Sequence, residues 1–501
     1  MFAQLRWHSI WIVMWGMVMM PPAFADEPVM TDITITDKVE DELIFDSAIT
    51  SANVDVQTTS GVVTLAGIVD SLMAKERAAR IASTVRGVRS VVNRLTVKPY
   101  KSLSDKQVKE AVENALWNDP ATESYEVTVT VQDGKVTLDG SVDSYQEAVL
   151  CANVAKTVSG VKAVEDSLRV DYDQDRPPYE IKLEIEARLK WDVLVDNGLI
   201  NVNVDKNGQV ALSGTVGSSA EKARAKADAW VAGVSAVDDS KLEVAKWLRD
   251  DELRGNKYVY KDESELEAAV ELALAYDPRV NSFDIHTDAI GNLVTLRGVV
   301  DNLGAKRAAE QDARNTVGVY SVKNRIKVRP ADSHSDEEIE ARVAAALRSN
   351  AFVDRYDVTV SAFNGVVHLY GTVDSYLEKT QVDDTASKVN GVVDVKNYLT
   401  VEHAEAYSYN PYVDNWNVYD YDWHDSRPQF TTKTDAEIAS AIESELWWSP
   451  YVSDDHITVS VDDGEATLTG HVSSHAAKGA ATDNAFDGGA TWVDNDLLVR
   501  Q

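Results

Sequence analysis

The sequence predicts an α+β fold of six tandem copies of a small αββαβ repeat, each a three-stranded mixed sheet with two helices on one face. Three observations lead to this prediction. A Gly-x-Val-x-Leu-x-Gly string recurs along the chain, amphipathic helical patterns stand on both sides of it, and a Gly-Val pair follows it at a nearly constant distance. The second glycines of the strings are Gly67, Gly140, Gly214, Gly298, Gly371 and Gly470. We expect these six glycines to have a structural role.

These glycines are 73, 74, 84, 73 and 99 residues apart, so two connections between copies are longer than the others. We name the copies repeats 1 to 6. Their predicted ranges are 37–99, 103–172, 178–244, 262–329, 334–401 and 433–501. Each copy has only about 65–70 residues, a size at which a hydrophobic core is marginal, so contacts between repeats would add stability. The pattern leaves open whether the repeats form a string or a compact stack.

The first 25 residues have the pattern of a secretory signal peptide. Arg6 is their only Lys or Arg, residues 10–20 are apolar, and an Ala-x-Ala sequence ends at Ala25. This combination is typical of a cleavable signal. An uncleaved anchor helix is the alternative, but the apolar segment is short for a membrane span and two prolines follow it. We therefore expect export, cleavage after Ala25, and no transmembrane helix in the rest of the chain.

Each repeat begins with an amphipathic helix. In repeat 2 the apolar residues of one helical face are Val108, Ala111, Val112, Ala115 and Leu116. Capping-box spacing marks the helix starts in repeats 2, 5 and 6, at Ser104 with Gln107, Ser335 with Glu338, and Thr434 with Glu437. Several of these helices are expected to end before a proline, at Asp119-Pro120, Asp277-Pro278 and Ser449-Pro450.

A β-hairpin follows the first helix. In repeat 2, Val127, Val129 and Val131 alternate with polar residues, which is the period of a half-buried strand. The turn at Asp133-Gly134 leads to the second strand. A second helix over residues 146–158 and a third strand complete the repeat. Two helices cover only one face of the sheet, so we expect the other face to stay polar and open.

These features resemble the BON domain family, named for bacterial osmotically inducible periplasmic proteins and nodulation proteins. The resemblance rests on the helix that ends at a proline, the Gly-x-Val-x-Leu-x-Gly hairpin and the final Gly-Val strand. Its six copies cover nearly all of the chain after residue 25. The resemblance implies an αββαβ fold and a periplasmic role in the bacterial envelope. Members of the family are associated with osmotic or envelope stress and with phospholipid surfaces.

The chain of 501 residues is strongly acidic, with 82 Asp and Glu against 49 Lys and Arg and a formal net charge of −33. This balance argues against nucleic acid as a partner, because Lys and Arg contacts to phosphate dominate such binding. It also argues against docking on anionic lipid by bulk charge alone. With one cysteine, Cys151, the chain forms no intramolecular disulfide, so packing must stabilise the fold.

Alignment of the repeats assigns the reactive side chains to framework positions. Cys151 lies 11 residues after Gly140, where the other repeats carry Ala or Val, so we expect a small buried residue and not a nucleophile. His286 and His368 are expected on the open face of their sheets.

His456, His471 and His475 suggest a metal site only weakly, because a spacing of four outside a helix does not bring two rings together. The chain contains no phosphate-binding Gly-Lys-Ser/Thr loop and no Gly-x-Ser-x-Gly elbow. Carboxylates are so abundant that no pair stands out. We therefore expect no catalytic residue, no metal and no other cofactor.

Residues 402–432 do not fit the repeat. This aromatic and acidic linker contains five rings that we expect to bind a partner: Tyr412, Trp416, Tyr419, Tyr421 and Trp423. Long segments outside a repeat framework are often functional or disordered. Three interpretations stay open: rings packed against repeats 5 and 6, an adhesive site for a glycan, protein or lipid, and a Ca²⁺ site built from the interspersed aspartates.

The sequence thus favours a non-enzymatic exported protein that supports the bacterial envelope. Its mechanism would be multivalent binding to membrane phospholipid or to envelope proteins under osmotic or envelope stress, with weak contacts from several repeats acting together. A periplasmic chaperone-like scaffold for other exported proteins is the alternative. An enzyme would need a convergent set of reactive residues, and the sequence offers none.

Overall fold

The computed structural model describes residues 30–46, 49, 53–100, 103–119, 122, 127–171, 176–245, 261–280, 284–330, 334–353, 358–374, 376–401, 433–449, 452 and 456–499. The expected signal peptide and the aromatic linker lie outside the described residues. Within the described part of the chain, no helix is long and apolar enough to cross a membrane.

The first three repeats each contain two helices and three strands. Repeat 1 consists of α1 (Asp32–Phe45), β1 (Val54–Thr59), β2 (Val62–Val69), α2 (Leu72–Thr84) and β3 (Ser90–Val97). Repeat 2 consists of α3 (Asp105–Asn118), β4 (Val127–Gln132), β5 (Lys135–Val142), α4 (Tyr145–Lys156) and β6 (Ala163–Val170). Repeat 3 consists of α5 (Pro178–Trp191), a 3₁₀ turn η3 (Asn197–Leu199), β7 (Ile200–Val204), β8 (Gln209–Val216), α6 (Ser219–Asp228) and β9 (Ala236–Val244).

The last three repeats have the same order. Repeat 4 consists of α8 (Glu263–Tyr276), β10 (Ile285–Ile290), β11 (Leu293–Val300), α9 (Leu303–Arg314) and β12 (Ser321–Val328). Repeat 5 consists of α10 (Asp336–Ser349), β13 (Val358–Phe363), β14 (Val366–Val373), α11 (Tyr376–Ser387) and β15 (Asp394–Val401). Repeat 6 consists of α12 (Asp435–Trp448), β16 (Ile457–Asp462), β17 (Glu465–Val472), α13 (His475–Asp487), β18 (Trp492–Asn495) and β19 (Leu498–Val499).

The second strand of each hairpin is the central strand of its sheet. β1 pairs antiparallel with β2, and β2 pairs parallel with β3. The other sheets repeat this order, and in repeat 6 the third strand is divided between β18 and β19, both paired with β17. The predicted fold of six αββαβ repeats with mixed three-stranded sheets is therefore confirmed.

Local signals place the first helix against its hairpin. The expected capping boxes form at Ser104, Ser335 and Thr434, and α3, α8 and α12 end two residues before their prolines. In repeat 2, the Asp105 carboxylate accepts hydrogen bonds from the backbone N–H groups of Asp133 and Gly134 at 2.8 and 2.9 Å. Both turn residues have positive φ, as a tight two-residue hairpin requires. A helix-start carboxylate thus fixes the hairpin turn.

Each repeat has its own hydrophobic core between its sheet and its two helices. In repeat 2 the core includes Leu116, Leu138 and Cys151, all almost completely buried. The expectation of a buried Cys151 is confirmed. Leu72 of α2 also lies in this core, and Leu303 of α9 lies in the core of repeat 5 in the same way. Burying such a leucine stabilises the fold by about 1.5–3 kcal/mol, so repeats 1 and 2, and repeats 4 and 5, stabilise each other.

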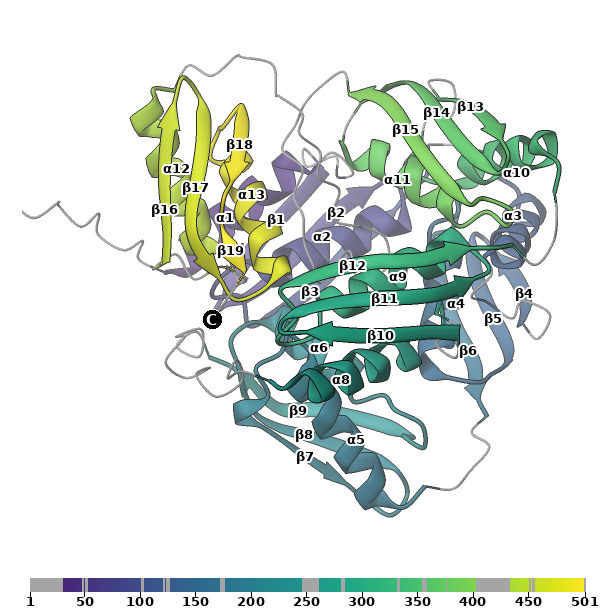
Figure 1. The fold of residues 1–501 in the computed structure, drawn as a ribbon, viewed down its shortest axis with the longest axis horizontal. Helices are drawn as coiled ribbons and strands as arrows, with labels where there is room; N and C mark the ends of the chain where they lie inside the picture. The colour runs from purple at the N-terminus through teal and green to yellow at the C-terminus, as the bar shows by residue number, and fades with distance from the viewer. Residues whose placement is uncertain are drawn as a thin grey trace, which may run out of the picture.

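The repeats form a compact stack. The second helices, α2, α4, α6, α9 and α11, gather in the middle of the molecule, and the sheets lie on its outside (Figure 1). On α11 even polar side chains are buried, including those of Lys379, Gln381 and Asp383. Burial of both helix faces explains this, because the sheet covers one face and helices of other repeats cover the second.

Pairs of repeats meet through one recurring contact between helix ends. At the junction of repeats 3 and 4, backbone hydrogen bonds join Val193 to Asn315 at 3.0 Å and Val317 to Trp191 at 2.9 Å. Repeats 2 and 5 are joined in the same way, with Val158 and Asn350 at the bridge.

At the corresponding ends of repeats 1 and 6, Arg86 donates a hydrogen bond from Nη1 to the Trp447 carbonyl oxygen at 3.0 Å. The repeats therefore pair in a nested order, 3 with 4, 2 with 5 and 1 with 6.

Candidate functional site

The structure gives the six hairpin glycines a common geometry. They have φ between +121° and +150°, in the region that L side chains rarely adopt. At Gly67, Gly214, Gly298 and Gly470, an added Cβ atom would lie 1.9–2.0 Å from the carbonyl oxygen of the residue before the first strand. The six positions are Gly67, Gly140, Gly214, Gly298, Gly371 and Gly470.

The five aromatic residues expected to bind a partner lie outside the described residues. They are Tyr412, Trp416, Tyr419, Tyr421 and Trp423. The assignment of these rings to partner binding stays a prediction.

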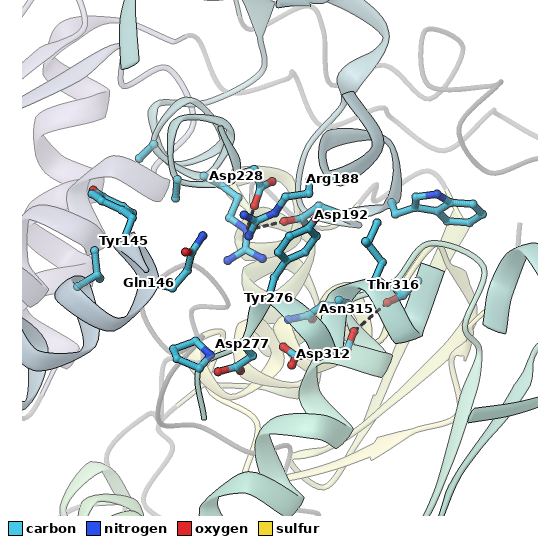
Figure 2. Close-up of a pocket in the computed structure, with 18 of the residues that line it drawn as sticks. Tyr145, Gln146, Arg188, Asp192, Asp228, Tyr276, Asp277, Asp312, Asn315 and Thr316 are labelled. Atoms are coloured by element: carbon cyan, nitrogen blue, oxygen red, sulfur yellow. Dashed lines mark hydrogen bonds and ion pairs between the residues drawn. The ribbon is translucent and has the colours of Figure 1, made fainter. Parts of the chain in front are cut away.

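A hollow among the described residues lies where repeats 1 to 4 meet. This junction pocket has a volume of about 370 Å³ and is lined by α2, α4, α5, α6, α8, α9 and the segments that follow three of these helices. Figure 2 shows its polar and aromatic side chains converging from several repeats. Its walls therefore depend on the nested packing and on no single repeat.

On the repeat 3 side, two carboxyl groups share a buried site. Asp192, the C-cap residue that follows α5, accepts a hydrogen bond from Arg224 Nε at 2.5 Å. Asp228, at the end of α6, lies beside Asp192 and is only 4% exposed. Burial, and then the charge of Asp192, raise the pKa of Asp228 to about 7. One carboxyl group of the pair thus retains a proton far above its usual range.

The repeat 4 side has the same arrangement. Asp277, which ends α8, accepts hydrogen bonds from Arg279 Nε at 2.9 Å and Nη2 at 2.5 Å. Burial opposes ionisation of Asp277, but Arg279 holds its pKa below the usual range. Burial, and then the charge of Asp277, raise the pKa of Asp312 well above the usual range. On each side of the pocket, a carboxyl group paired with an arginine thus lies beside one whose pKa is raised.

Aromatic rings and arginines form the rest of the polar wall. Tyr145 of repeat 2 stacks on Trp230 of repeat 3, with ring centroids 4.2 Å apart. Arg188 places its guanidinium 4.3 Å from the Tyr276 ring centroid and donates to the Trp230 carbonyl oxygen at 3.2 Å. Burial, and then a hydrogen bond to Glu184, raise the pKa of the Tyr276 phenol. These contacts between repeats 2, 3 and 4 fix the rings around the opening.

The outer faces of the sheets were expected to be polar, and they are only partly so. In repeat 5, His368, Tyr370 and Tyr398 form a stack of parallel rings, and Tyr370 and Tyr398 are about half exposed. Phe363 and Ile290 are 68% and 75% exposed at equivalent hairpin ends. Apolar neighbours across the hairpins, such as Val366 opposite Phe363, shield these side chains in part.

The remaining reactive residues form no further site among the described residues. His286 and His368 lie on outer sheet faces, as expected. The rings of His456 and His471 have centroids 4.5 Å apart. In the part of the chain that the structure describes, no group of three or more His, Cys, Asp or Glu is placed to hold a metal ion.

Sequence reasoning missed the carboxyl pairs of the junction pocket. The sequence indicates Asp277 only as the residue before Pro278. A closer alignment would have found the signal, because Asp228 and Asp312 both lie 14 residues after the hairpin glycine of their repeat. Repeat 5 has a neutral version of the pair, in which Asn350 donates to Thr385 Oγ1 at 2.9 Å.

Comparisons with known proteins agree with this architecture. Osmotically-inducible protein Y of Escherichia coli (strain K12) is 36% identical over 146 residues, which cover 28% of this chain and 73% of that protein. Outer membrane lipoprotein DolP of Haemophilus influenzae is 33% identical over 138 residues, which cover 26% of this chain and 71% of that protein. A structure of CdsD, a structural protein of the type III secretion system of Chlamydia trachomatis, is 17% identical.

That structural match covers 45% of this chain and 94% of the CdsD chain with a TM-score of 0.13, too low to bear on the fold. The sequence model of the BON domain matches six times, at residues 31–99, 104–172, 180–246, 262–330, 335–403 and 434–501. These matches span most of the sequence and fall on the six αββαβ units of the structure. The chain therefore belongs to the BON domain family.

Proposed function

We propose that this chain is a non-enzymatic, exported protein of the bacterial envelope, and that it binds membrane phospholipid or envelope proteins through several repeats at once. The names of two relatives support the setting, since one is osmotically inducible and the other is an outer membrane lipoprotein. The expected signal peptide supports export to the periplasm. Osmotic or envelope stress is the condition in which we expect the protein to act.

One structural observation carries the multivalent mechanism: all six sheets lie on the outside of the helical stack (Figure 1). Their outer faces are held in fixed relative positions by the nested junctions. Weak contacts from several such faces add through effective concentration, provided that the geometry allows them to engage together.

Apolar side chains on these faces indicate how a membrane would be contacted. With a net charge of −33, bulk attraction to anionic lipid is not available to the chain. Ile290 and Phe363, exposed at hairpin ends, are suited to apolar contact with a membrane or a protein. The equivalent residue of repeat 2 is Gln132, which is polar and provides a matched control position.

Vesicle sedimentation tests the lipid version. The full chain should bind phosphatidylcholine vesicles weakly, with little change when phosphatidylglycerol or salt is added. The double substitution I290S/F363S should abolish this binding, and Q132S should leave it unchanged. Strong binding to anionic vesicles that disappears in modest salt, or unchanged binding by I290S/F363S, would rule out the apolar mode.

Two further measurements separate the other versions of this function. A photo-crosslinker at Trp416, in the aromatic linker, should capture an envelope protein in intact cells if proteins are the partners. The chaperone-like scaffold predicts instead that the full chain suppresses aggregation of an unfolded exported protein far better than one isolated repeat does.

A further inference from the structure

The outer face of the repeat 4 sheet carries a row of cations. Lys323, Arg325 and Lys327 are alternate residues of β12, and all three are exposed. We call these three residues the cation row. Arg297 of β11, also exposed, lies directly opposite Arg325 in the parallel ladder. In Figure 1 this sheet faces the viewer with α9 behind it, so the row is open to a partner.

The cation row is specific to repeat 4 and is not a general feature of the fold. At the three equivalent positions of the third strand, each of the other repeats has at most one cation. These positions hold Val92, Arg94 and Thr96 in repeat 1, Glu165, Ser167 and Arg169 in repeat 2, Asp238, Lys241 and Glu243 in repeat 3, Lys396, Tyr398 and Thr400 in repeat 5, and Asp494, Asp496 and Leu498 in repeat 6. Repeat 4 therefore concentrates positive charge that the fold does not require, in a chain with a net charge of −33.

The charges of this face are not compensated within the described part of the chain. The exposed side chains of β10, β11 and β12 include four cations and one carboxylate, that of Asp288. Asp288 Oδ2 lies 3.3 Å from Arg297 Nε, whereas the cation row forms no ion pair with any described residue. Like charges directly opposite each other on neighbouring strands destabilise a sheet. A bound anion would therefore relieve the repulsion between Arg297 and Arg325.

Protection of the sheet edge does not explain the cation row. β12 is an edge strand, and lysines on such strands can prevent pairing with another chain. Asn324 already covers part of this edge, because its side chain accepts from the Ile326 backbone N–H at 3.1 Å and donates to the Lys306 carbonyl oxygen at 2.9 Å. Asn93 of repeat 1 and Asn397 of repeat 5 make the same contacts without a row of cations. We therefore expect a partner to contact the side chains of the row and not the main chain of β12.

The spacing of the row and the charge of the whole protein favour one kind of anion. Alternate residues of a strand are about 6.5 Å apart, and the side chains of an extended peptide lying along β12 would repeat at the same distance. A broad anionic surface such as a membrane would also approach the acidic parts of the protein around this face. A narrow segment senses mainly the cation row, because charges more than about 8 Å away are screened at physiological ionic strength.

We propose that the outer face of the repeat 4 sheet binds an extended acidic segment of a partner protein. Carboxylates at alternate positions of this segment pair with Lys323, Arg325 and Lys327. The planar guanidinium of Arg325 suits a carboxylate that binds through both oxygens. This inference rests on the protein version of the proposed function and adds to it the chemistry of the partner and the repeat that contacts it.

Fluorescence anisotropy on the full chain tests this site. The probe is a labelled peptide of alternating glutamate and threonine, the same peptide with glutamine in place of glutamate is the uncharged control, and phosphatidylglycerol vesicles present a membrane anion. K323T/R325T/K327T removes the cation row and introduces a residue that other repeats have on this strand, such as Thr96. R94T/R169T/K396T is the matched control, because it removes three exposed cations from the third strands of other repeats and changes the net charge equally.

We expect the glutamate peptide to bind more weakly as salt is added, and the glutamine peptide not to bind. The affinity for the glutamate peptide should fall at least about tenfold in K323T/R325T/K327T, as the loss of three exposed ion pairs allows. It should stay within about twofold in R94T/R169T/K396T. Absence of binding, an equal loss in the two variants, or binding of the vesicles through the row in place of the peptide overturns the proposal. Thermal unfolding establishes that each variant is folded, and R325T decides the outcome if the triple variant is not.

This outcome can be separated from that of the proposed function. If the glutamate peptide fails to bind while the crosslinker at Trp416 captures an envelope protein, the repeat 4 site is wrong and the proposed function stands. If the peptide binds through the row and no envelope protein is captured, the site is supported and the protein version of the proposed function fails.

Discussion

Asp228 and Asp312 occupy the same position in repeats 3 and 4, and both face the pocket between these repeats. Each lies beside the aspartate that ends the first helix of its own repeat, Asp192 or Asp277. The two pairs therefore repeat one arrangement on opposite sides of the junction. Repeat 5 reaches a similar arrangement with Asn350 and Thr385, which are neutral, so the fold does not require the charges.

The raised pKa of Asp228 predicts a pH dependence of stability. Its pKa is about 7 in the folded chain and about 3.9 in an unfolded one. Between these two pH values, Asp228 is therefore protonated in the folded state and ionised in the unfolded state. The free energy of unfolding falls as the pH rises through this window. A single retained proton gives a slope of about 1.4 kcal/mol per pH unit.

Urea unfolding at pH 5 and pH 7 measures this effect. The unaltered chain should be less stable at pH 7, and D228N, which has no proton to lose there, should show a smaller difference between the two pH values. D462N, at an exposed aspartate that ends β16, is the control and should keep the pH dependence of the unaltered chain. An equal pH dependence in D228N and in the unaltered chain would show that Asp228 does not retain its proton.

The hairpin glycines predict a sharp contrast within repeat 4. Gly298 has a φ of +150°, and a Cβ atom there would lie 2.0 Å from the Asp284 carbonyl oxygen. Gly291, in the turn of the same hairpin, has a φ of +58° and open space around it. G298A should destabilise the chain by more than about 3 kcal/mol, because the strand must move.

G291A should cost only about 1–2 kcal/mol, the penalty of the left-handed conformation alone. Thermal unfolding of the two variants gives the comparison. Similar melting temperatures for G291A and G298A would mean that the hairpin relaxes around the new methyl group.

The repeat and its elements could be predicted from sequence because their signals are local. The alternation of Val127, Val129 and Val131 and the capping box at Ser104 depend on residues only a few positions apart. The nested order of the repeats gives no such signal. Asp192 bridges to Thr316, 124 residues away, and the repeats are too similar for their patterns to specify which helix ends meet.

The candidate site escaped prediction for a related reason. Within any one repeat, an aspartate before a proline, such as Asp277, indicates only the end of a helix. Its second role depends on Asp312, 35 residues later, and on the alanines of another repeat across the junction. The site therefore forms only when the repeats of the chain pack together.

Cys151 should be inert in the folded chain. It is fully buried in the core of repeat 2, and burial, then the nearby Glu147 and Asp119, raise its pKa to about 12. A thiol without access and without thiolate character does not react. Iodoacetamide at pH 8 should leave it unlabelled, and the same reagent in denaturant should label it completely. Rapid labelling of the folded chain would show that repeat 2 opens readily.

The junction of repeats 1 and 6 predicts how repeat 6 is retained in the stack. The Arg86 guanidinium lies 4.2 Å from the Trp447 ring centroid and donates to the Trp447 carbonyl oxygen at 3.0 Å. Lys38 of α1 also forms an ion pair with Glu445 of α12. Loss of the Arg86 hydrogen bond and cation–π contact should weaken the junction by about 1–2 kcal/mol.

Hydrogen exchange read by mass spectrometry locates this effect. In R86A, amides of α12 and the neighbouring segments of repeat 6 should exchange several-fold faster, because repeat 6 detaches more often, while repeats 3 and 4 keep their protection. R89A, an exposed arginine three residues further on, is the control and should exchange like the unaltered chain. If R86A leaves the exchange of repeat 6 unchanged, other contacts hold it, and the Lys38–Glu445 pair is the next to remove.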